Sequence, residues 1–242
     1  MATVQGLDVS KWQDDNTTPQ QIDFNKAKRA GAYFVFIKAS QDVYADPDFA
    51  YNWNAAKTAG LIRGAYHFFD YRKSPKTQAD YLASLLKDDW GELPPVLDFE
   101  KHPAWDLPTR DKCLRMIKEF FTQLETTCPK KPLFYTNPSM IKYTLSPIPD
   151  WLLEHPLWIA HYYVSAPSYK PWAKWHFWQY SDRGDGLAYG MESLQVDMNW
   201  WNGTLEELHQ FANLEPPPPP PPTLEERLAK LEAEARAHGW NV

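Results

Sequence analysis

The stretch LPPVLDFE, Leu93–Glu100, indicates both the fold class and the chemistry of this chain. Its first five residues form an apolar run that is typical of a short buried strand. Two carboxylates then follow at positions i and i+2. Because alternate side chains of a strand point to the same side, Asp98 and Glu100 share one face while Phe99 points to the other.

Paired carboxylates at the end of a strand suit the hydrolysis of glycosidic bonds. One carboxylic acid protonates the leaving oxygen, and the other group supports the positive charge that develops at the anomeric carbon. An isolated Asp-x-Glu is more often a solvated strand end, because charged side chains usually stay in water. The rest of the sequence therefore decides between these two interpretations.

The chain alternates segments typical of strands with segments typical of helices. The strand-like segments are Gly6–Ser10, Tyr33–Ala39, Ile62–Phe69, Pro95–Glu100, Leu133–Thr136, Leu157–Ala160, His176–Tyr180 and Gln195–Met198. The helix-like segments include Asp23–Ala30, Phe49–Ala59, Lys76–Asp88, Arg110–Thr127 and Leu205–Phe211. The alternation weakens after residue 150, where Trp, Tyr and Pro dominate. The pattern predicts an α/β fold, an irregular TIM-like (β/α) barrel.

In such a barrel, acidic residues from three strands converge. Barrel active sites lie at the carboxyl ends of the strands, where Asp98 and Glu100 are expected. Asp8 is expected at the end of the first strand and Asp197 on the last, and these two strands are neighbours when a barrel closes. Four carboxylates at one mouth are costly unless the site handles protons or positive charge. Asp8 could alternatively be a structural residue that bonds its own turn.

Aromatic residues are abundant, with 12 Trp, 13 Tyr and 12 Phe. Their rings can cover the flat faces of sugars, although most of them fill the core. The candidates for sugar stacking or hydrogen bonding are Tyr66, Tyr135, Trp158, Tyr162 and Trp178. Core packing is an equally good account of each candidate alone. His67 is expected to be a packed, hydrogen-bonded histidine rather than a catalyst.

Charge and composition exclude several classes of function. The formal net charge is −6 and no Lys/Arg run exists, so no nucleic-acid partner is expected. No apolar stretch is long enough to span a membrane, and residues 1–6 lack the features of a signal peptide. The seven histidines show no ligand spacing, so neither a metal nor a cofactor is expected. Cys113 and Cys128 are too far apart along one predicted helix to pair, and we expect free thiols.

The chain divides into a barrel over residues 1–214, a linker over 215–223 and an amphipathic helix over 224–242. Residues 216–222 are seven consecutive prolines, which favour an extended polyproline II spacer. In the tail, Leu224, Leu228, Leu231 and Ala235 recur at the spacing of a coiled-coil seam. We expect weak self-association through this helix, although about two heptads are short for a stable coiled coil.

Eight motifs occur in order over about residues 4–211: GLDVSKWQ (6–13), FIKAS (36–40), GAYHF (64–68), PVLDFE (95–100), FYTN (134–137), LWIA (157–160), WQY (178–180) and VDMN (196–199). Together they resemble the motifs of the glycoside hydrolase family 25 muramidases, which are lysozymes with an irregular (β/α) barrel. Each motif alone is weak, whereas eight in order are specific. One departure is visible: family members often carry Glu-Gly where this chain has Gln41-Asp42.

The resemblance implies hydrolysis of the β-1,4 bond between N-acetylmuramic acid and N-acetylglucosamine in bacterial peptidoglycan. It places Glu100 as the general acid and Asp98 as the partner that supports participation by the substrate's 2-acetamido group. Asp8 and Asp197 match the flanking acidic positions. A general acid needs a raised pKa; nearby like charge and limited solvation would raise the pKa of Glu100, with Asp98 as the ionised partner.

Three interpretations remain open at this level. The first is a phage or prophage endolysin, made in the host cytoplasm and acting on the bacterial cell wall. The second is a chitinase-like barrel, but the further Asp residues expected before its final acid are replaced here by Pro95 and Val96. The third is a non-catalytic module that binds cell-wall sugars, which would be expected to have lost Asp98 or Glu100.

Overall fold

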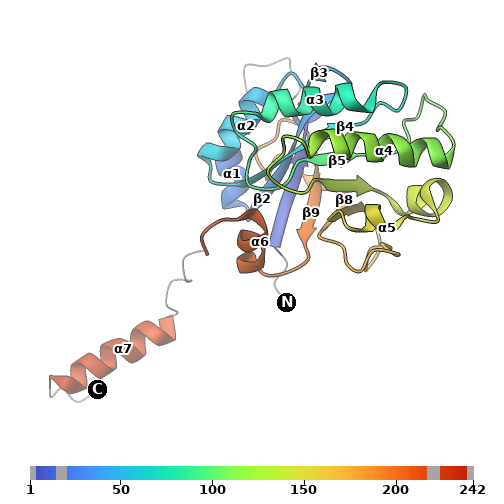
Figure 1. Cartoon of the computed structure of the whole chain (residues 1–242). Coiled ribbons are helices and arrows are strands. Elements are labelled where there is room, and N and C mark those ends of the chain that lie inside the picture. The colour runs from blue at the N-terminus through green and yellow to red at the C-terminus, as the bar shows by residue number, and fades with distance from the viewer. Residues whose placement is uncertain (1–3, 15–20, 217–223, 239–242) are drawn as a thin grey trace.

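The computed structural model describes residues 4–14, 21–216 and 224–238 of the 242-residue chain. Its strands form one sheet, and a pairing between the first strand and the second closes that sheet into a barrel. The barrel strands are β1 Val4–Val9, β2 Phe34–Gln41, β4 Ile62–Phe68, β5 Val96–Asp98, β6 Leu133–Thr136, β7 Leu157–Ala160, β8 Phe177–Asp185 and β9 Gln195–Trp201. A short strand, β3 Tyr44–Ala45, pairs with the end of β2. The predicted TIM-like barrel is confirmed (Figure 1).

The irregularity of the barrel lies in its last strand. β9 runs antiparallel to both of its neighbours, β8 and β1 (Figure 1). The connection between β8 and β9 spans residues 186–194, which is too short for the crossover that a parallel pair needs. Asp197 therefore reaches the mouth of the barrel from near the beginning of its strand, and not from the carboxyl end as in a regular barrel.

Helices pack on the outer face of the barrel, although no described helix connects β7 to β8 or β8 to β9 (Figure 1). They are α1 Phe24–Arg29, α2 Phe49–Thr58, α3 Pro75–Leu86, α4 Arg110–Leu124 and the short α5 Asp150–Leu153. The predicted helices are confirmed, with ends that shift by up to three residues. Helix α5 and the short helical turns at Lys11–Gln13 and Met140–Leu145 were not predicted. Helix α6, Leu205–Ala212, begins with a capping box between Thr204 and Glu207.

Two apolar layers hold these elements together. The outer layer lies between the strands and helices such as α4, whose buried face includes Ile117 and Phe120. The inner layer fills the barrel with large aromatic rings. There the ring of Phe36 stacks on Trp158 with centroids 4.2 Å apart, and Leu208 of α6 belongs to the same cluster. The filled interior leaves the mouth as the place where a substrate can enter.

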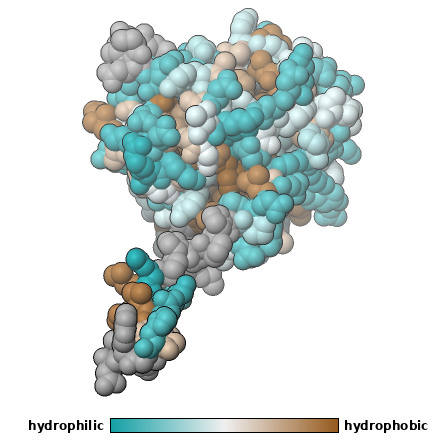
Figure 2. Space-filling view, turned by 90° about the vertical axis from the view of Figure 1, so that its left-hand side faces the viewer, coloured by the Kyte–Doolittle hydropathy of each residue, from teal (hydrophilic) through white to brown (hydrophobic). Residues whose placement is uncertain are grey.

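Helix α7, Leu224–Ala237, projects away from the barrel (Figure 1). Its apolar residues gather along one side, as Figure 2 shows, and Leu224, Leu228 and Leu231 are 79%, 57% and 63% exposed. The predicted spacer falls largely on residues 217–223, which lie outside the described residues. No helix in the described ranges is long and apolar enough to cross a membrane. Both cysteines are free thiols, as predicted.

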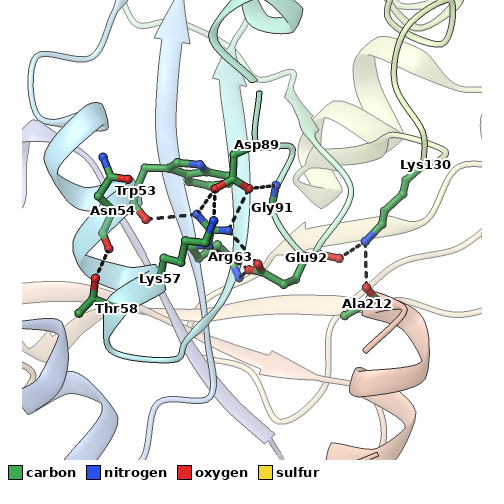
Figure 3. Close-up of polar contacts among 10 residues, drawn as sticks. All are labelled: Trp53, Asn54, Lys57, Thr58, Arg63, Asp89, Gly91, Glu92, Lys130 and Ala212. Carbon is green, nitrogen blue, oxygen red and sulfur yellow. Dashed lines mark hydrogen bonds and ion pairs between the residues drawn. The ribbon is translucent and has the colours of Figure 1, made fainter. Parts of the chain in front are cut away.

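A buried ion network fixes the end of the barrel opposite the mouth (Figure 3). Arg63, near the start of β4, is fully buried. Its guanidinium donates to Asp89 at 3.0 Å and to Glu92 at 2.7 Å, both in the segment that leads into β5. Lys130 donates to the backbone oxygens of Glu92 and Ala212, the latter at 2.9 Å. The network thus ties β4, the approach to β5 and the end of α6 together.

Candidate active site

A polar cavity of about 270 Å³ opens at the mouth of the barrel. Strands β1, β2, β4, β5, β6, β7, β8 and β9, or the residues directly after them, all contribute to its wall. The lining residues are Asp8, Ser10, Trp12, Gln13, Lys38, Tyr66, Phe68, Asp98, Glu100, Tyr135, Trp158, Tyr162, Gln179 and Asp197. The cavity thus brings together four carboxyl groups from three distant parts of the sequence.

All but one of the residues predicted for the site line this cavity. The exception is Trp178. Its neighbours Phe177 and Gln179 point into the barrel, so the alternation of the strand turns Trp178 outward. There the indole N–H donates to the backbone oxygen of His161 at 2.8 Å, and the ring packs in the outer layer. Trp178 is therefore not part of the candidate site.

His67 is also turned away from the cavity, as predicted. Its ring nitrogens lie 2.8 Å from Ser40 Oγ and 3.1 Å from Gln78 Oε1, both buried among the outer elements. Burial lowers the pKa of His67 to about 4, so the ring is neutral at physiological pH. It positions the strand and takes no part in proton transfer at the mouth.

Gln179 of β8 is the hub of the polar network, and sequence reasoning missed it. Its side-chain N–H group donates to Asp8 Oδ2 at 2.7 Å and to Asp197 Oδ2 at 3.2 Å. Its side-chain oxygen accepts from the hydroxyls of Tyr135 at 2.8 Å and Tyr162 at 2.7 Å. The motif WQY carried the signal, but only the barrel shows that its central residue faces inward.

Asn199 supports the same network from β9. Its amide N–H donates to Asp8 Oδ2 at 2.8 Å, and its oxygen accepts from the indole N–H of Trp158 at 2.8 Å. The ring of Trp158 is buried, so it forms the floor of the cavity and offers no free face. By contrast, the ring of Trp12 at the rim is 72% exposed and is available to cover a sugar face.

Asp8 and Asp197 form a coupled acidic pair. They are direct partners across the antiparallel strands β1 and β9. Burial raises the pKa of Asp8 to about 6, although hydrogen bonds from Asn199 and Gln179 oppose the shift. Burial and the charge of Asp8 raise the pKa of Asp197 to about 9. Near neutral pH, Asp197 therefore keeps a proton that it donates to the carboxylate of Asp8.

Asp98, like Asp8, is an almost completely buried carboxyl group of the cavity. The side chain is buried, and among the described residues its Oδ1 has no hydrogen-bond partner. Burial, followed by the charge of Glu100, raises its pKa well above the usual value. The free site therefore favours a protonated Asp98, which differs from the ionised partner that the sequence led us to expect. A buried acceptor without a donor is costly unless a ligand supplies one.

Glu100 is placed to hold a proton near neutral pH. Burial is the main cause that raises its pKa to about 7, and the charge of Asp8 adds to the shift. Lys38 opposes it. This lysine of β2 was not among the predicted site residues, because the sequence pattern shows no reason to favour one strand lysine over another. Its Nζ donates to Gln41 Oε1 at 3.2 Å and lies 5.0 Å from the ring centroid of Phe68.

The described part of the chain shows no group of three or more His, Cys, Asp or Glu side chains arranged to hold a metal ion. The side chains of the cavity are instead suited to holding and transferring protons. It contains one carboxylic acid with a pKa near neutrality, a second buried carboxyl with a vacant acceptor oxygen, and a hydrogen-bonded acidic pair beside them.

Comparisons with known proteins agree with this geometry. The sequence profile described as Glycosyl hydrolases family 25 matches residues 7–187. The chain is 35% identical to Lysozyme M1 of Streptomyces globisporus over 219 residues, which cover 87% of this chain and 71% of that protein. It is 33% identical to the N,O-diacetylmuramidase of a Chalaropsis species over 224 residues, covering 87% and 99% respectively. The bacterial lysozyme of Streptomyces coelicolor superposes with a TM-score of 0.76 at 32% identity, covering 88% of this chain and 98% of that one.

Proposed function

This chain belongs to glycosyl hydrolase family 25 and is a peptidoglycan-lytic muramidase, and we propose that it cleaves the β-1,4 bond between N-acetylmuramic acid and N-acetylglucosamine. The observation that carries the proposal is the placement of Asp98 and Glu100 in one cavity at the mouth of the barrel. Glycoside hydrolysis needs such a pair of carboxyl groups, one to give a proton and one to support positive charge.

Glu100 acts as the general acid in this proposal. With a pKa of about 7, it holds its proton in neutral solution and gives it to the glycosidic oxygen as the bond to the anomeric carbon breaks. The resulting carboxylate then takes a proton from the water that completes the reaction. Lys38 lies close enough to lower the pKa of Glu100, and it stabilises the carboxylate that forms after proton transfer.

Asp98 orients the substrate's 2-acetamido group. Its unpartnered Oδ1 can accept the amide N–H, which satisfies an oxygen that the free protein leaves without a donor. The amide oxygen then attacks the anomeric carbon and forms a cyclic oxazolinium, whose positive charge the Asp98 carboxylate supports. Hydrogen bonding from the substrate and the nearby charge of Lys38 both favour the ionised form of Asp98 once the sugar is bound. Water opens the ring from the same face that the leaving group occupied, so the configuration is retained.

The remaining polar residues bind and orient the glycan. The Asp8 and Asp197 pair, held by Gln179, presents oxygens to the sugar hydroxyls, and the phenols of Tyr135 and Tyr162 extend the same network. Tyr66 contributes to the wall. The exposed ring of Trp12 at the rim covers a sugar face.

Loss of turbidity of isolated bacterial cell walls, measured together with new reducing ends, tests this proposal. Both signals should appear together and should depend on Glu100. Loss of turbidity without new reducing ends would indicate cleavage of the peptides instead of the glycan. Binding without either signal would favour the non-catalytic module, and faster cleavage of chitin oligosaccharides than of wall glycan would favour the chitinase-like alternative.

For the biological setting, we propose a phage or prophage endolysin that is made in the host cytoplasm and acts on the bacterial wall. Production of the chain inside a bacterium tests this. Lysis is expected only after the membrane is opened by a separate pore-forming agent. Rapid lysis without that agent would contradict the proposed route to the wall.

A further inference from the structure

A second cavity, of about 380 Å³, opens beside the catalytic cavity at the same mouth of the barrel. Its lining comes from the turn after β1, from β2 and β3 with the residues that connect and follow them, and from the loop after β4. Lys38 lines both cavities. Lys38 therefore lies at the boundary between the two cavities.

The second cavity is lined mainly by charged side chains of both signs. Lys38 contributes a cation whose hydrogen bond goes to a neutral amide, Gln41 Oε1, at 3.2 Å. No carboxylate lies within ion-pair distance of its Nζ among the described residues. A carboxylate of a ligand could therefore bind Lys38 without first displacing an ion pair.

The aspartates of the second cavity differ in how firmly their ion pairs hold them. Asp70 is buried and paired with Arg72 at 2.7 Å, so it belongs to the framework. Asp42 and Lys73 are separated by 3.8 Å, and the Lys73 side chain is 54% exposed. The Asp42 side chain is 16% exposed, but at this separation and with the lysine side chain largely in solvent the pair contributes little to stability. Asp42 also has a left-handed backbone with φ of 51°, which is unusual for a residue other than glycine. This rim pair can exchange its partners for the ammonium and carboxylate groups of a ligand.

The chemistry of the lining favours a peptide over a further sugar. A short peptide carries both carboxylate and ammonium groups, and this cavity offers cations and carboxylates side by side. The ring of Tyr44, 72% exposed at the rim, adds one apolar surface for an aliphatic side chain. The volume lies within the range of cavities that bind small organic molecules.

We propose that this second cavity binds the short peptide that is attached to the lactyl group of the substrate glycan, with a peptide carboxylate on Lys38 and further charged groups on the Asp42 and Lys73 pair. The assignment rests on the proposed function, since the glycan must first occupy the catalytic cavity. It makes the enzyme selective for peptide-bearing over peptide-free glycan.

Two defined substrates test the proposal with the full chain: a peptidoglycan oligosaccharide whose lactyl groups carry a tripeptide with a free carboxylate and an amine, and the same oligosaccharide without the peptide. The value of kcat/KM should be about tenfold higher for the peptide-bearing substrate, as one charge-assisted hydrogen bond can provide. Lys73→Glu should lower the ratio of the two values by about fivefold, the size of a partly exposed charge interaction.

The matched control is Lys76→Glu, which makes the same charge change on an exposed helical residue that does not line the cavity. It should leave the ratio as it is in the unmodified chain. Dissociation constants of both oligosaccharides, measured on the Glu100→Gln variant, should show the same preference without turnover.

Distinct results separate the failure of this proposal from that of the proposed function. Equal kcat/KM for both substrates, with normal wall lysis, would overturn the peptide site alone. Preference for the peptide-free substrate that Lys73→Glu abolishes would assign the cavity to the free lactyl carboxylate and also overturn it. No cleavage of either substrate by the unmodified chain would overturn the proposed function itself.

Discussion

Asp8 on β1 and Asp197 on β9 face each other as direct partners across an antiparallel strand pair, and the two carboxyl groups share a hydrogen bond. Gln179 donates to both of them. Two buried acidic groups in contact cannot both ionise without a large cost. One proton therefore stays on Asp197 at neutral pH. Keeping this proton lowers the free energy of unfolding as the pH rises.

Asp197→Asn should stabilise the fold relative to the unmodified chain as the pH rises. The pKa of Asp197 is raised to about 9 in the folded protein, so the folded state binds more protons than the unfolded state between about pH 4 and 9, and stability falls over that window. The Asp197→Asn variant has no titrating group at this position, so it does not lose stability in this way as the pH rises. Thermal unfolding at pH 5 and pH 8 measures it, at about 2–4 °C per kcal/mol for a chain of this size. An equal difference in Tm at both pH values would contradict the assignment.

Glu100→Gln should lower the rate of wall hydrolysis by at least about 10²–10⁴-fold, because the amide cannot give a proton to the leaving oxygen. The change is nearly isosteric, so the Tm and the circular dichroism spectrum should stay close to those of the unmodified chain. Glu206→Gln, at an exposed position of α6, is the matched control and should keep full activity. Near-normal lysis by Glu100→Gln would remove Glu100 from its role.

Asp98→Asn should also be severely impaired, by about 10²-fold or more, the size of effect seen when a group that stabilises transition-state charge is lost. The residual product should keep the β configuration. The 2-acetamido oxygen still bonds to the anomeric carbon on one face of the sugar, so water attacks from the other face. NMR of the product immediately after cleavage distinguishes the anomers. Initial release of the α-anomer, by this variant or by the unmodified chain, would show inversion and exclude assistance by the substrate.

The rate of hydrolysis should fall as the pH rises through about 7, because the protonated fraction of Glu100 decreases there. The carboxyl groups of the cavity titrate together, so the apparent pKa belongs to the set. Lys38→Met removes a positive charge that lowers the pKa of Glu100, and the falling limb should move to higher pH. Lys76→Met should not move it. A limb that moves to lower pH with Lys38→Met would contradict the sign of this interaction.

The full chain should self-associate weakly through α7, while a truncation that ends at Leu214 stays monomeric. The exposed residues Leu224, Leu228 and Leu231 form the contact stripe that the heptad spacing predicts. Sedimentation over micromolar concentrations compares the two forms, and Leu228→Glu in the full chain serves as a point-variant control. Identical monomer masses for all forms would refute the prediction. Wall lysis in dilute assays should survive the truncation, because the candidate site lies wholly within the barrel.

The sequence alone determined the features that depend on short-range patterns. The strand-like runs and the helix-like segments Arg110–Thr127 and Leu205–Phe211 are local patterns, and each appears in the structure close to where it was expected. The i, i+2 spacing likewise predicted Asp98 and Glu100 at one mouth, and both line the cavity, although β5 ends at Asp98 and Glu100 lies just beyond it.

Only the tertiary structure decided which faces and charges meet. Barrel strands are apolar on both sides, so the pattern around WQY could not tell that Gln179 points inward and Trp178 outward. The antiparallel direction of β9 follows from a short connection and places Asp197 against Asp8. The raised pKa values of Asp98 and Glu100, the influence of Lys38 and the second cavity all arise from burial among residues distant in sequence. Desolvation and charge interactions depend on distance in space, and a linear sequence does not contain that distance.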